Sequence, residues 1–334
     1  MPDISVIVPT RDRRRLLLRT LRSVRAQRDV DLEVIVVVDG SSDGSADAVR
    51  ALGDERISVL CLSEPGGVAA ARNVGLGSAR APWVAFLDDD DLWAPDKLTA
   101  QLDVAAADDA IGWVCGGALT VDRELRIVSG GRPPTPQAVR RLPSVNCIPG
   151  GGSGTMARTD LVRAVGGFDP RLANIADWDL WIRLAAEAPL GVVDRPLTAY
   201  RRHLSSLSND LRHVEDEFEY VQAKHAVARR ATGLPENTRT LEWFAHRQVS
   251  LGNRWGAAQA YLDLWRRFDS PKCLPWAALA LVAPQALSRR RDRAGLRRLP
   301  AWWVEAGERW LAPLRRDEGP DPAAPTPDPV PATP

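Results

Sequence analysis

The sequence predicts an α/β fold with a mainly parallel sheet covered by helices on both faces, followed by a C-terminal helical extension. Over the first third of the chain, short apolar segments rich in Val and Ile alternate with amphipathic segments. This alternation is typical of parallel strands joined by crossover helices. From about residue 211 onward the apolar residues follow helical spacing instead, and no segment has the alternating spacing of a strand.

Four strands are expected in the first third, and polar residues follow three of them. The strands are expected at 4–8, 32–38, 57–62 and 83–87, and the intervening helices at 13–26, 45–51 and 68–77. Asp12 and Ser45 are residue types that cap helix N-termini. Ligands of parallel sheets bind beyond the carboxyl ends of the strands. The polar segments at 9–12, 39–41 and 88–91 should therefore converge on one crevice.

The segment 88–91 consists of four consecutive aspartates at the end of a buried strand. Carboxylates packed this closely repel one another unless a cation neutralises them. Oxygen ligands suit Mg²⁺ or Mn²⁺, and Mg²⁺ is usually held by one or two carboxylates together with substrate phosphates. The alternative is a solvated acidic turn in which Asp91 caps the next helix.

The composition is that of an ordinary globular protein. The 334 residues are 45% hydrophobic and carry a net charge of +1, so nothing global indicates a nucleic-acid partner. The four cysteines are far apart and include no C-x-x-C pair, which argues against a zinc site and fits reduced thiols. No apolar run reaches the ~20 residues of a membrane span, and the chain begins directly with a strand, so no leader is expected. A cytoplasmic location is the resulting expectation.

Four segments of the first third resemble, in the right order, the successive motifs of bacterial family 2 glycosyltransferases of GT-A fold. They are residues 4–10, 37–41, 66–75 and 86–93. The resemblance implies a nucleotide-diphosphate sugar donor, a divalent cation (Mn²⁺ or Mg²⁺), and transfer with inversion at the anomeric carbon. Pro9 and Thr10 of the first motif would then line the donor site.

The same resemblance implies roles for the aspartates. Asp39 would hold the edge of the base, Asp88 the ribose, and Asp90 the metal that bridges the diphosphate, while Asp89 fills the variable middle position. Val38 stands where the family commonly has another Asp, which leaves the choice of base open.

Arg72 follows a Gly-Gly turn and could place its guanidinium on a phosphate or base of the donor. The alternative is an exposed helical arginine. The glycine-rich segment 150–155 lacks the Lys-Ser/Thr ending of a P-loop. It is interpreted either as a flexible connector or as backbone that must lie close to the donor.

Residues 176–183 resemble the family's Glu-Asp-x-Asp-Leu-x-x-Arg motif, whose Asp is the general base. Asp177 falls on that Asp, and Ala176 falls on the usual Glu. An inverting transfer needs one base to remove the proton of the acceptor hydroxyl. The alternative for Asp177 is a helix N-cap, a role that Asp179 could equally fill.

Residues 200–208 resemble the family's Tyr-Arg-x-His-x-x-Ser loop, which places His203 against the diphosphate or the metal. A solvated loop histidine is the alternative. The expected domains are a catalytic domain at 1–210, a helical region at 211–316 and a Pro-rich disordered tail at 317–334.

The segment 274–316 combines an apolar stretch, a cluster of arginines and several tryptophans. Such a combination could lie on an anionic membrane surface, at the inner face of the plasma membrane. A helical bundle packed on the catalytic domain, with solvated arginines, is the alternative. The sequence does not indicate an oligomeric state.

The leading interpretation is an inverting, metal-dependent glycosyltransferase that acts on a hydroxyl of a glycan, a lipid-linked acceptor or a small molecule. The first alternative is a non-catalytic subunit that binds carbohydrate or nucleotide sugar, suggested only by Val38 and Ala176. A nucleotidyltransferase is a weaker alternative, because residues 9–12 do not form a Gly-rich phosphate loop.

Overall fold

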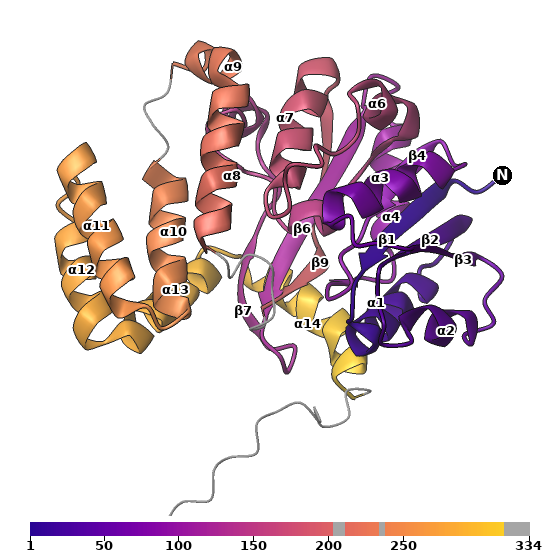
Figure 1. Cartoon of the computed structure of the whole chain (residues 1–334), viewed down its shortest axis with the longest axis horizontal. Helices are drawn as coiled ribbons and strands as arrows, with labels where there is room; N and C mark the ends of the chain where they lie inside the picture. Colours follow the sequence, from indigo (N-terminus) through magenta and orange to yellow (C-terminus); the bar gives the residue numbers. More distant parts are fainter. Residues whose placement is uncertain (203–210, 234–237, 317–334) are drawn as a thin grey trace, which may run out of the picture.

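One mixed sheet organises the first two thirds of the molecule, and a separate group of helices stands beside it (Figure 1). The computed structural model describes residues 1–202, 211–233 and 238–316. The strands are β1 (Ile4–Thr10), β2 (Leu32–Asp39), β3 (Ile57–Leu62), β4 (Trp83–Phe86), β5 (Leu92–Trp93), β6 (Trp113–Val121), β7 (Ile127–Gly131), β8 (Thr155–Arg158) and β9 (Leu190–Arg201). Helices α1 to α7 are Arg14–Arg25, Ser45–Arg50, Val68–Ser78, Lys97–Ala106, Pro136–Val139, Thr159–Ala164 and Ala176–Glu187, with a 3₁₀ helix, η1, at Gly151–Gly154. Helices α8 to α14 are Leu211–Lys224, Ala226–Ala231, Thr238–Ser250, Arg254–Phe268, Cys273–Val282, Pro284–Arg297 and Ala301–Arg316.

The strand order is β3-β2-β1-β4-β8-β6-β9-β5, and β7 pairs with β6 outside this path. The predicted parallel sheet is confirmed for β1 to β4, where all neighbouring pairs are parallel. Beyond β4 the sheet is mixed, because β8 runs antiparallel to both β4 and β6, whereas β9 is parallel to β6. The carboxyl ends of β1, β2 and β4 therefore lie along one edge.

Both faces of the parallel part are buried, because alternate side chains of a strand point to opposite faces. Ile7 and Val37 pack on one face with α3 and α7, whereas Val6 and Val36 pack on the other face with α1 and α4. This two-sided burial explains why the strands are almost continuously apolar.

Two expected helix caps are wrong. Asp12 has a left-handed backbone (φ 50°) and lies before the helix, where its Oδ1 accepts a hydrogen bond from the Ser42 amide. Ser45 is the first residue of α2, and its amide and hydroxyl both donate to Asp43. Both side chains therefore form hydrogen bonds with residues of the turn between β2 and α2, and not with the backbone amides of a helix N-terminus.

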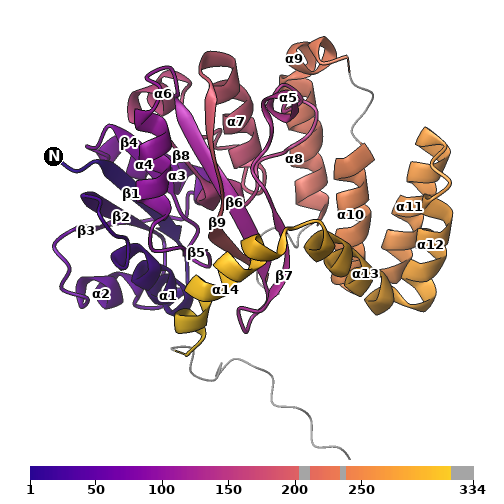
Figure 2. The same ribbon diagram turned by 180° about the vertical axis from the view of Figure 1, so that it is seen from behind.

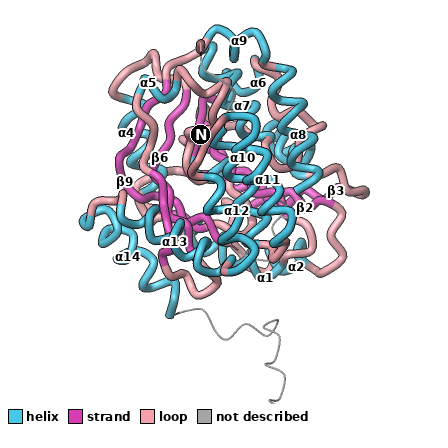
Figure 3. The backbone as a smooth tube through the Cα atoms, turned by 90° about the vertical axis from the view of Figure 1, so that its left-hand side faces the viewer, coloured by secondary structure: helices cyan, strands magenta, loops and turns pink. Residues whose placement is uncertain are grey.

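Helices α10 to α13 form a group with its own apolar core, which includes Ala245, Tyr261, Leu264, Cys273 and Ala277. The group stands at the end of the molecule opposite β3 (Figures 1 and 3). No helix in the described ranges is long and apolar enough to cross a membrane. Residues 317–334, expected to be a disordered tail, lie outside the described residues.

Helix α14 leaves this group and returns to the sheet, where it lies beside β9 (Figure 2). Trp303 and Leu311 are fully buried against Leu119 and Val121 of β6. Trp310 donates from Nε1 to the carbonyl of Pro196, at 2.9 Å. The last described helix is therefore part of the covering of the sheet.

Candidate active site

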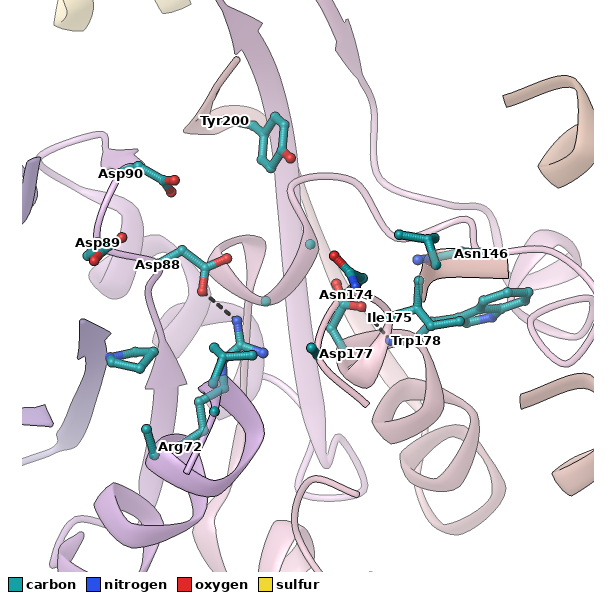
Figure 4. Close-up of a pocket in the computed structure, with 18 of the residues that line it drawn as sticks. Arg72, Asp88, Asp89, Asp90, Asn146, Asn174, Ile175, Asp177, Trp178 and Tyr200 are labelled. Carbon is teal, nitrogen blue, oxygen red and sulfur yellow. Dashed lines mark hydrogen bonds and ion pairs between the residues drawn. The ribbon is translucent and has the colours of Figure 1, made fainter. Parts of the chain in front are cut away.

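The predicted crevice exists. A cavity of about 730 Å³ opens beyond the carboxyl ends of β1, β2 and β4, and its wall continues across η1 to α7, α8 and α10. It is lined by all the predicted site residues that the structure describes, namely Pro9, Thr10, Asp39, Arg72, Asp88, Asp89, Asp90 and Asp177. His203 lies outside the described residues. Figure 4 shows the three aspartates 88–90 on one side of the pocket and Asp177 on the other.

Arg72 is a buried pocket residue, so its interpretation as an exposed helical arginine is wrong. It is 5% exposed, its guanidinium lies 5.0 Å from the centre of the Phe168 ring, and it forms an ion pair with Asp88. Its Nε is buried without a hydrogen-bond partner within the described ranges. A buried donor of this kind is normally satisfied, so it leaves room for one further acceptor in the pocket.

Asp89 and Asp90 are held by the last residue of β1, Thr10, and by Arg13, which directly precedes α1. Thr10 Oγ1 donates to Asp89 at 2.7 Å, and Arg13 Nη1 lies 3.1 Å from Asp89 Oδ1 and 2.9 Å from Asp90 Oδ2. Burial and the charge of Asp90 raise the pKa of Asp89 to about 7, although Arg13 acts in the opposite direction. Arg13 thus supplies part of the positive charge that an acidic cluster requires.

Asp91 does not cap a helix, contrary to the alternative interpretation of this cluster. Its side chain is fully buried and accepts hydrogen bonds from Ser153 Oγ at 2.6 Å and from the Arg201 amide at 3.1 Å. Burial, together with the charges of Asp90 and Asp88, raises the pKa of Asp91 well above its ordinary value. Asp91 therefore ties the end of β4 to η1 and β9 and does not face the pocket.

Asp88 and Asp90 are the carboxylates available to a divalent cation. Within the described ranges, no group of three or more Asp, Glu, His or Cys side chains is arranged to hold a metal by itself. Mg²⁺ is usually bound by one or two carboxylates and completed by substrate phosphates. The donor set therefore fits a cation that is bound jointly with a diphosphate, provided that Asp90 exchanges Arg13 for the metal.

Asp39 holds the turn that opens α3. Its Oδ1 accepts from the amide of Gly66 at 2.6 Å and its Oδ2 from the amide of Gly67 at 2.9 Å. Gly67 has φ 85°, a backbone conformation that favours glycine. The carboxylate thereby fixes the Gly-Gly turn that leads to Arg72.

The glycine-rich segment is an ordered wall of the pocket, so its interpretation as a flexible connector is wrong. Gly152 and Gly154 are buried within η1. A Cβ atom on Gly151 would lie 3.1 Å from Asp177 Oδ2, and one on Gly152 would lie 3.3 Å from Arg72 Nη2. The absence of a Cβ atom at Gly151 and Gly152 therefore lets the backbone of η1 lie close to both side chains without displacing them.

Asp177 stands in the first turn of α7, whose N-cap is Ile175. Its Oδ1 accepts a hydrogen bond from the Trp178 amide at 2.7 Å. Burial raises the pKa of Asp177 to about 6, and the positive charge of Arg72 offsets part of this effect. A carboxyl group with this pKa is largely deprotonated at neutral pH but binds a proton more readily than an ordinary Asp.

Asp179 belongs to a separate, buried ionic network. It is 0% exposed and interacts with Lys224 and His225 at 2.8 Å each and with Arg183 at 2.7 Å. Burial by itself would raise its pKa, but the hydrogen bonds from His225 and Lys224 and the charge of Arg183 lower the pKa of Asp179 to about 2. Since it also does not line the pocket, Asp179 is neither the N-cap nor a second candidate base.

Several pocket residues were not predicted from the sequence. Arg13, Asn174 and Tyr200 line the wall beside the aspartates and Asp177, and Phe218 of α8 and Phe244 of α10 line its far end. Tyr200 belongs to the family-like segment 200–208, whereas Arg13, Asn174 and the two phenylalanines belong to none of the family-like motifs. The two phenylalanines reach the pocket only because α8 and α10 pack beside α7, which no local pattern indicates.

The fold and the pocket define a GT-A-type α/β domain with a C-terminal helical extension. Residues 5–157 match the model described as Glycosyl transferase family 2. The matched part of the chain carries Asp39, Arg72 and the aspartates 88–91.

Individual curated proteins are also similar to part of this chain. The succinoglycan biosynthesis protein ExoO of Rhizobium meliloti (strain 1021) is 36% identical over 107 residues, which are 32% of this chain and 31% of that protein. The chain spans only 31% and 41% of the lengths of two curated relatives that it matches.

Among solved structures, S. aureus TarS in complex with UDP-GlcNAc is 18% identical, with a TM-score of 0.56 and coverage of 88% of this chain and 92% of that one. The mannosyltransferase PcManGT of Pyrobaculum calidifontis, in complex with GDP-Man and Mn²⁺, is 22% identical, with a TM-score of 0.50 and coverage of 93% and 87%. At these identities the likeness shows the shared fold.

Proposed function

We propose that the protein is an inverting glycosyltransferase that moves a sugar from a nucleotide-diphosphate donor to an acceptor hydroxyl. The proposal rests on one observation: residues that could bind a diphosphate and its cation line the same pocket as a carboxylate that could act as a base. Asp88, Asp90 and Arg72 form one wall, and Asp177, with its raised pKa, forms the other. This arrangement leaves space between a diphosphate-binding wall and a base.

Asp39, Arg72 and Asp88 bind the donor in this proposal, together with Pro9, Thr10 and Asp89 along the same wall. Arg72 can donate its unpartnered Nε to a phosphate or base oxygen. The solved structures of TarS with UDP-GlcNAc and of PcManGT with GDP-Man support a nucleotide sugar as the donor class. By its position in the family-like loop, His203 would contact the diphosphate or the metal.

Asp90 binds Mn²⁺ or Mg²⁺ in this proposal, and the Mn²⁺ in the PcManGT structure supports the class of metal. A divalent cation bound here supplies Lewis-acid stabilisation of the charge on the departing diphosphate. The contribution of the chain is to direct one or two carboxylates to that cation and to hold Asp89 with Thr10.

Asp177 acts as the general base. It accepts the proton of the acceptor hydroxyl while the hydroxyl oxygen forms a bond to the anomeric carbon from the side opposite the leaving group. The bond between that carbon and the phosphate oxygen breaks, and its electron pair leaves with the nucleotide diphosphate. Because one displacement occurs, the configuration at the anomeric carbon is inverted.

A panel of nucleotide sugars tests this proposal. The full chain is incubated with Mn²⁺ and each of several UDP-, GDP- and dTDP-sugars, and release of nucleotide diphosphate is followed with water as the default acceptor. Release from one donor or a small group of donors is expected. Binding of donors without turnover, even with acceptor extracts, would favour the alternative of a non-catalytic binding subunit.

A cytoplasmic location with peripheral contact to an anionic membrane is proposed as well. Arg254 of α11 and four arginines of α13 line one surface cavity: Arg289, Arg290, Arg293 and Arg297. None of the five forms an ion pair within the described ranges, whereas Trp255 and Val282 nearby in the chain are 78% and 80% exposed. Unpaired arginines beside exposed apolar side chains are typical of surfaces that bind anionic lipid.

A further inference from the structure

Glu217 of α8 binds the loop that leads into Asp177. The Glu217 side chain is 3% exposed, and its two oxygens accept hydrogen bonds from the backbone amides of Ala173, Asn174 and Ile175 at 2.8 to 3.2 Å. Three amides bound to one buried carboxylate fix the course of the backbone just before α7. A residue of the C-terminal helical region therefore positions the segment that carries the base.

The same carboxylate also fixes the side chain of Asn174. The Nδ2 of Asn174 donates to Glu217 Oε1 at 3.2 Å. An ionised carboxylate only accepts hydrogen bonds, so the amide must turn its NH₂ group toward Glu217. Its carbonyl oxygen, Oδ1, is then directed away from Glu217.

That oxygen is buried and has no partner among the described residues. Asn174 lines the pocket, and Figure 4 shows its side chain next to Asp177 on the wall opposite Asp88 and Asp90. An unsatisfied buried acceptor destabilises the protein and calls for an explanation. A ligand hydroxyl beside Asp177 would satisfy it.

We infer that Asn174 binds a second hydroxyl of the acceptor substrate, adjacent to the hydroxyl that Asp177 deprotonates, and that Glu217 holds Asn174 in the orientation this requires. The inference rests on the proposed glycosyl transfer and adds a condition to it, namely that the acceptor carries two neighbouring hydroxyls. The hydrogen bond from this second hydroxyl to Asn174 aligns the acceptor on the base, because an acceptor held through two neighbouring hydroxyls has little freedom to rotate away.

This arrangement also gives a physical meaning to Ala176. The family-like motif has Glu at this position, and Ala176 is buried and offers no hydrogen bond. Glu217 brings a carboxylate to the same turn from α8, and Asn174 supplies a neutral acceptor in the pocket. The chain thus provides polar groups near Asp177 from two positions outside the motif.

Asn174→Ala is the test variant, and Asn146→Ala is its matched control. Asn146 lies in the same pocket, but its Oδ1 already accepts from the Ile148 amide at 3.1 Å. Glu217→Gln is the second variant, because a neutral side chain no longer dictates which end of the Asn174 amide faces the pocket. Saturation-transfer NMR would measure the binding of methyl glycosides of glucose, galactose, mannose and N-acetylglucosamine to each protein with UDP or GDP and Mg²⁺.

At least one glycoside is expected to bind the wild type, and Asn174→Ala should weaken it about tenfold, the effect of one lost hydrogen bond. Glu217→Gln should weaken it similarly, while Asn146→Ala stays within about twofold. Among the mono-deoxy analogues of that glycoside, the one that lacks the hydroxyl bound by Asn174 should bind wild type and Asn174→Ala equally.

Affinity for the nucleotide diphosphate, measured by calorimetry on the same samples, separates the two proposals. It should be the same in all variants, which also reports that they are folded. Loss of nucleotide binding in the wild type itself would contradict the proposed function. Normal nucleotide binding with no glycoside bound by the wild type, or with equal glycoside binding by wild type and Asn174→Ala, would overturn the role of Asn174 alone.

Discussion

Arg13 neutralises Asp90 in this structure, with 2.9 Å between Arg13 Nη1 and Asp90 Oδ2. The Asp90 side chain is 12% exposed, so the pair is only partly reached by solvent. A divalent cation that binds Asp90 must displace this guanidinium. The metal is therefore expected to bind well only when a diphosphate supplies further oxygen ligands.

Nucleotide diphosphate binding is expected to require a divalent cation. Asp88 and Asp90 would otherwise repel the diphosphate, and their ion pairs with Arg72 and Arg13 neutralise only part of this acidic cluster. Calorimetry with UDP, GDP and dTDP should detect binding with Mn²⁺ or Mg²⁺ and a large loss of affinity in chelator. Asp90→Ala with metal should behave like the wild type in chelator. Equal affinities with and without metal would remove Asp90 from the metal site.

Asp177→Asn should separate chemistry from donor binding. The substitution keeps the size of the side chain but removes its basicity, and loss of a positioned base costs about 10²- to 10⁴-fold in rate. Turnover with the best donor should fall by that order, while the affinity for metal and nucleotide diphosphate stays near that of the wild type. Full activity of Asp177→Asn would place the base elsewhere, and the buried, ion-paired Asp179 could not replace it.

The fold of the catalytic part could be predicted because its signals are local. Residues 4–8 and 32–38 are apolar runs of strand length that end in polar residues, and the carboxyl ends of parallel strands must share one edge. This geometry was sufficient to bring Asp39, Asp88 and Asp90 together. Strand β8 and its antiparallel pairing between β4 and β6 were not predicted, because this pairing joins residues that are far apart in the chain.

The residues that bury and hold the site side chains could not be predicted either, because they come from distant parts of the chain. Asp91 has the same sequence context as Asp90, but the partners that bury it, Ser153 and the Arg201 amide, come from η1 and β9. In the sequence Arg72 does not differ from other helical arginines, and only the structure shows its contacts with Phe168 and Asp88. Motifs identify residues that meet the ligand, whereas their buried partners are fixed by tertiary packing.

The rate should depend on pH through Asp177. Its pKa is raised to about 6 from an ordinary value of 3.8, and only the deprotonated form can accept a proton. The kcat/KM should therefore be nearly constant above about pH 7, reach about half of its plateau near pH 6 and fall about tenfold per pH unit below about pH 5. An active donor and acceptor pair allows the profile to be measured directly. A plateau extending to pH 4.5 would mean that no group with this pKa acts as the base.

The raised pKa of Asp177 also predicts that Asp177→Asn, although it loses activity, is more stable than the wild type at neutral pH. A carboxyl whose folded pKa is raised favours the folded state when protonated, and this contribution is lost as pH rises from about 4 through 6. Asp177→Asn removes the cost of the buried charge, so its Tm should exceed that of the wild type at pH 7.5 and approach it at pH 4. Thermal unfolding at the two pH values would reveal the difference. A variant that is less stable at pH 7.5 would contradict the assigned pKa.

Trp303 and Trp302 are neighbours with opposite surroundings, which makes them a matched pair. Trp303 is 0% exposed against β6, whereas Trp302 is 49% exposed. Trp303→Ala should lower the free energy of unfolding by about 3–5 kcal/mol, the usual cost of truncating a buried tryptophan. Trp302→Ala should change it by less than about 1 kcal/mol. Denaturant unfolding measures both, and equal values would mean that α14 is not docked on the sheet.

Membrane contact should depend on α13 and not on α14. The predicted membrane segment included both helices, but Trp303, Trp310 and Leu311 pack on the sheet and cannot insert into lipid at the same time. Four arginines of α13 form no ion pair within the described ranges, namely Arg289, Arg290, Arg293 and Arg297. Electrostatic attraction to an anionic surface contributes about 1 kcal/mol per basic residue and is screened by salt.

The variant Arg289→Gln/Arg293→Gln/Arg297→Gln tests this directly. The full chain should co-sediment with vesicles of phosphatidylglycerol and phosphatidylcholine at low salt and be released at about 0.5 M NaCl, where the Debye length is only a few ångströms. Loss of three charges should weaken the binding about 10²-fold, since each contributes about 1 kcal/mol. Arg22→Gln/Arg28→Gln/Arg141→Gln makes the same change in net charge on exposed arginines elsewhere and should bind like the wild type. Equal loss of vesicle binding in both triple variants would mean that net charge alone, and not α13, causes the binding. If the wild type does not bind vesicles at low salt, these arginines are solvated residues of a helical bundle.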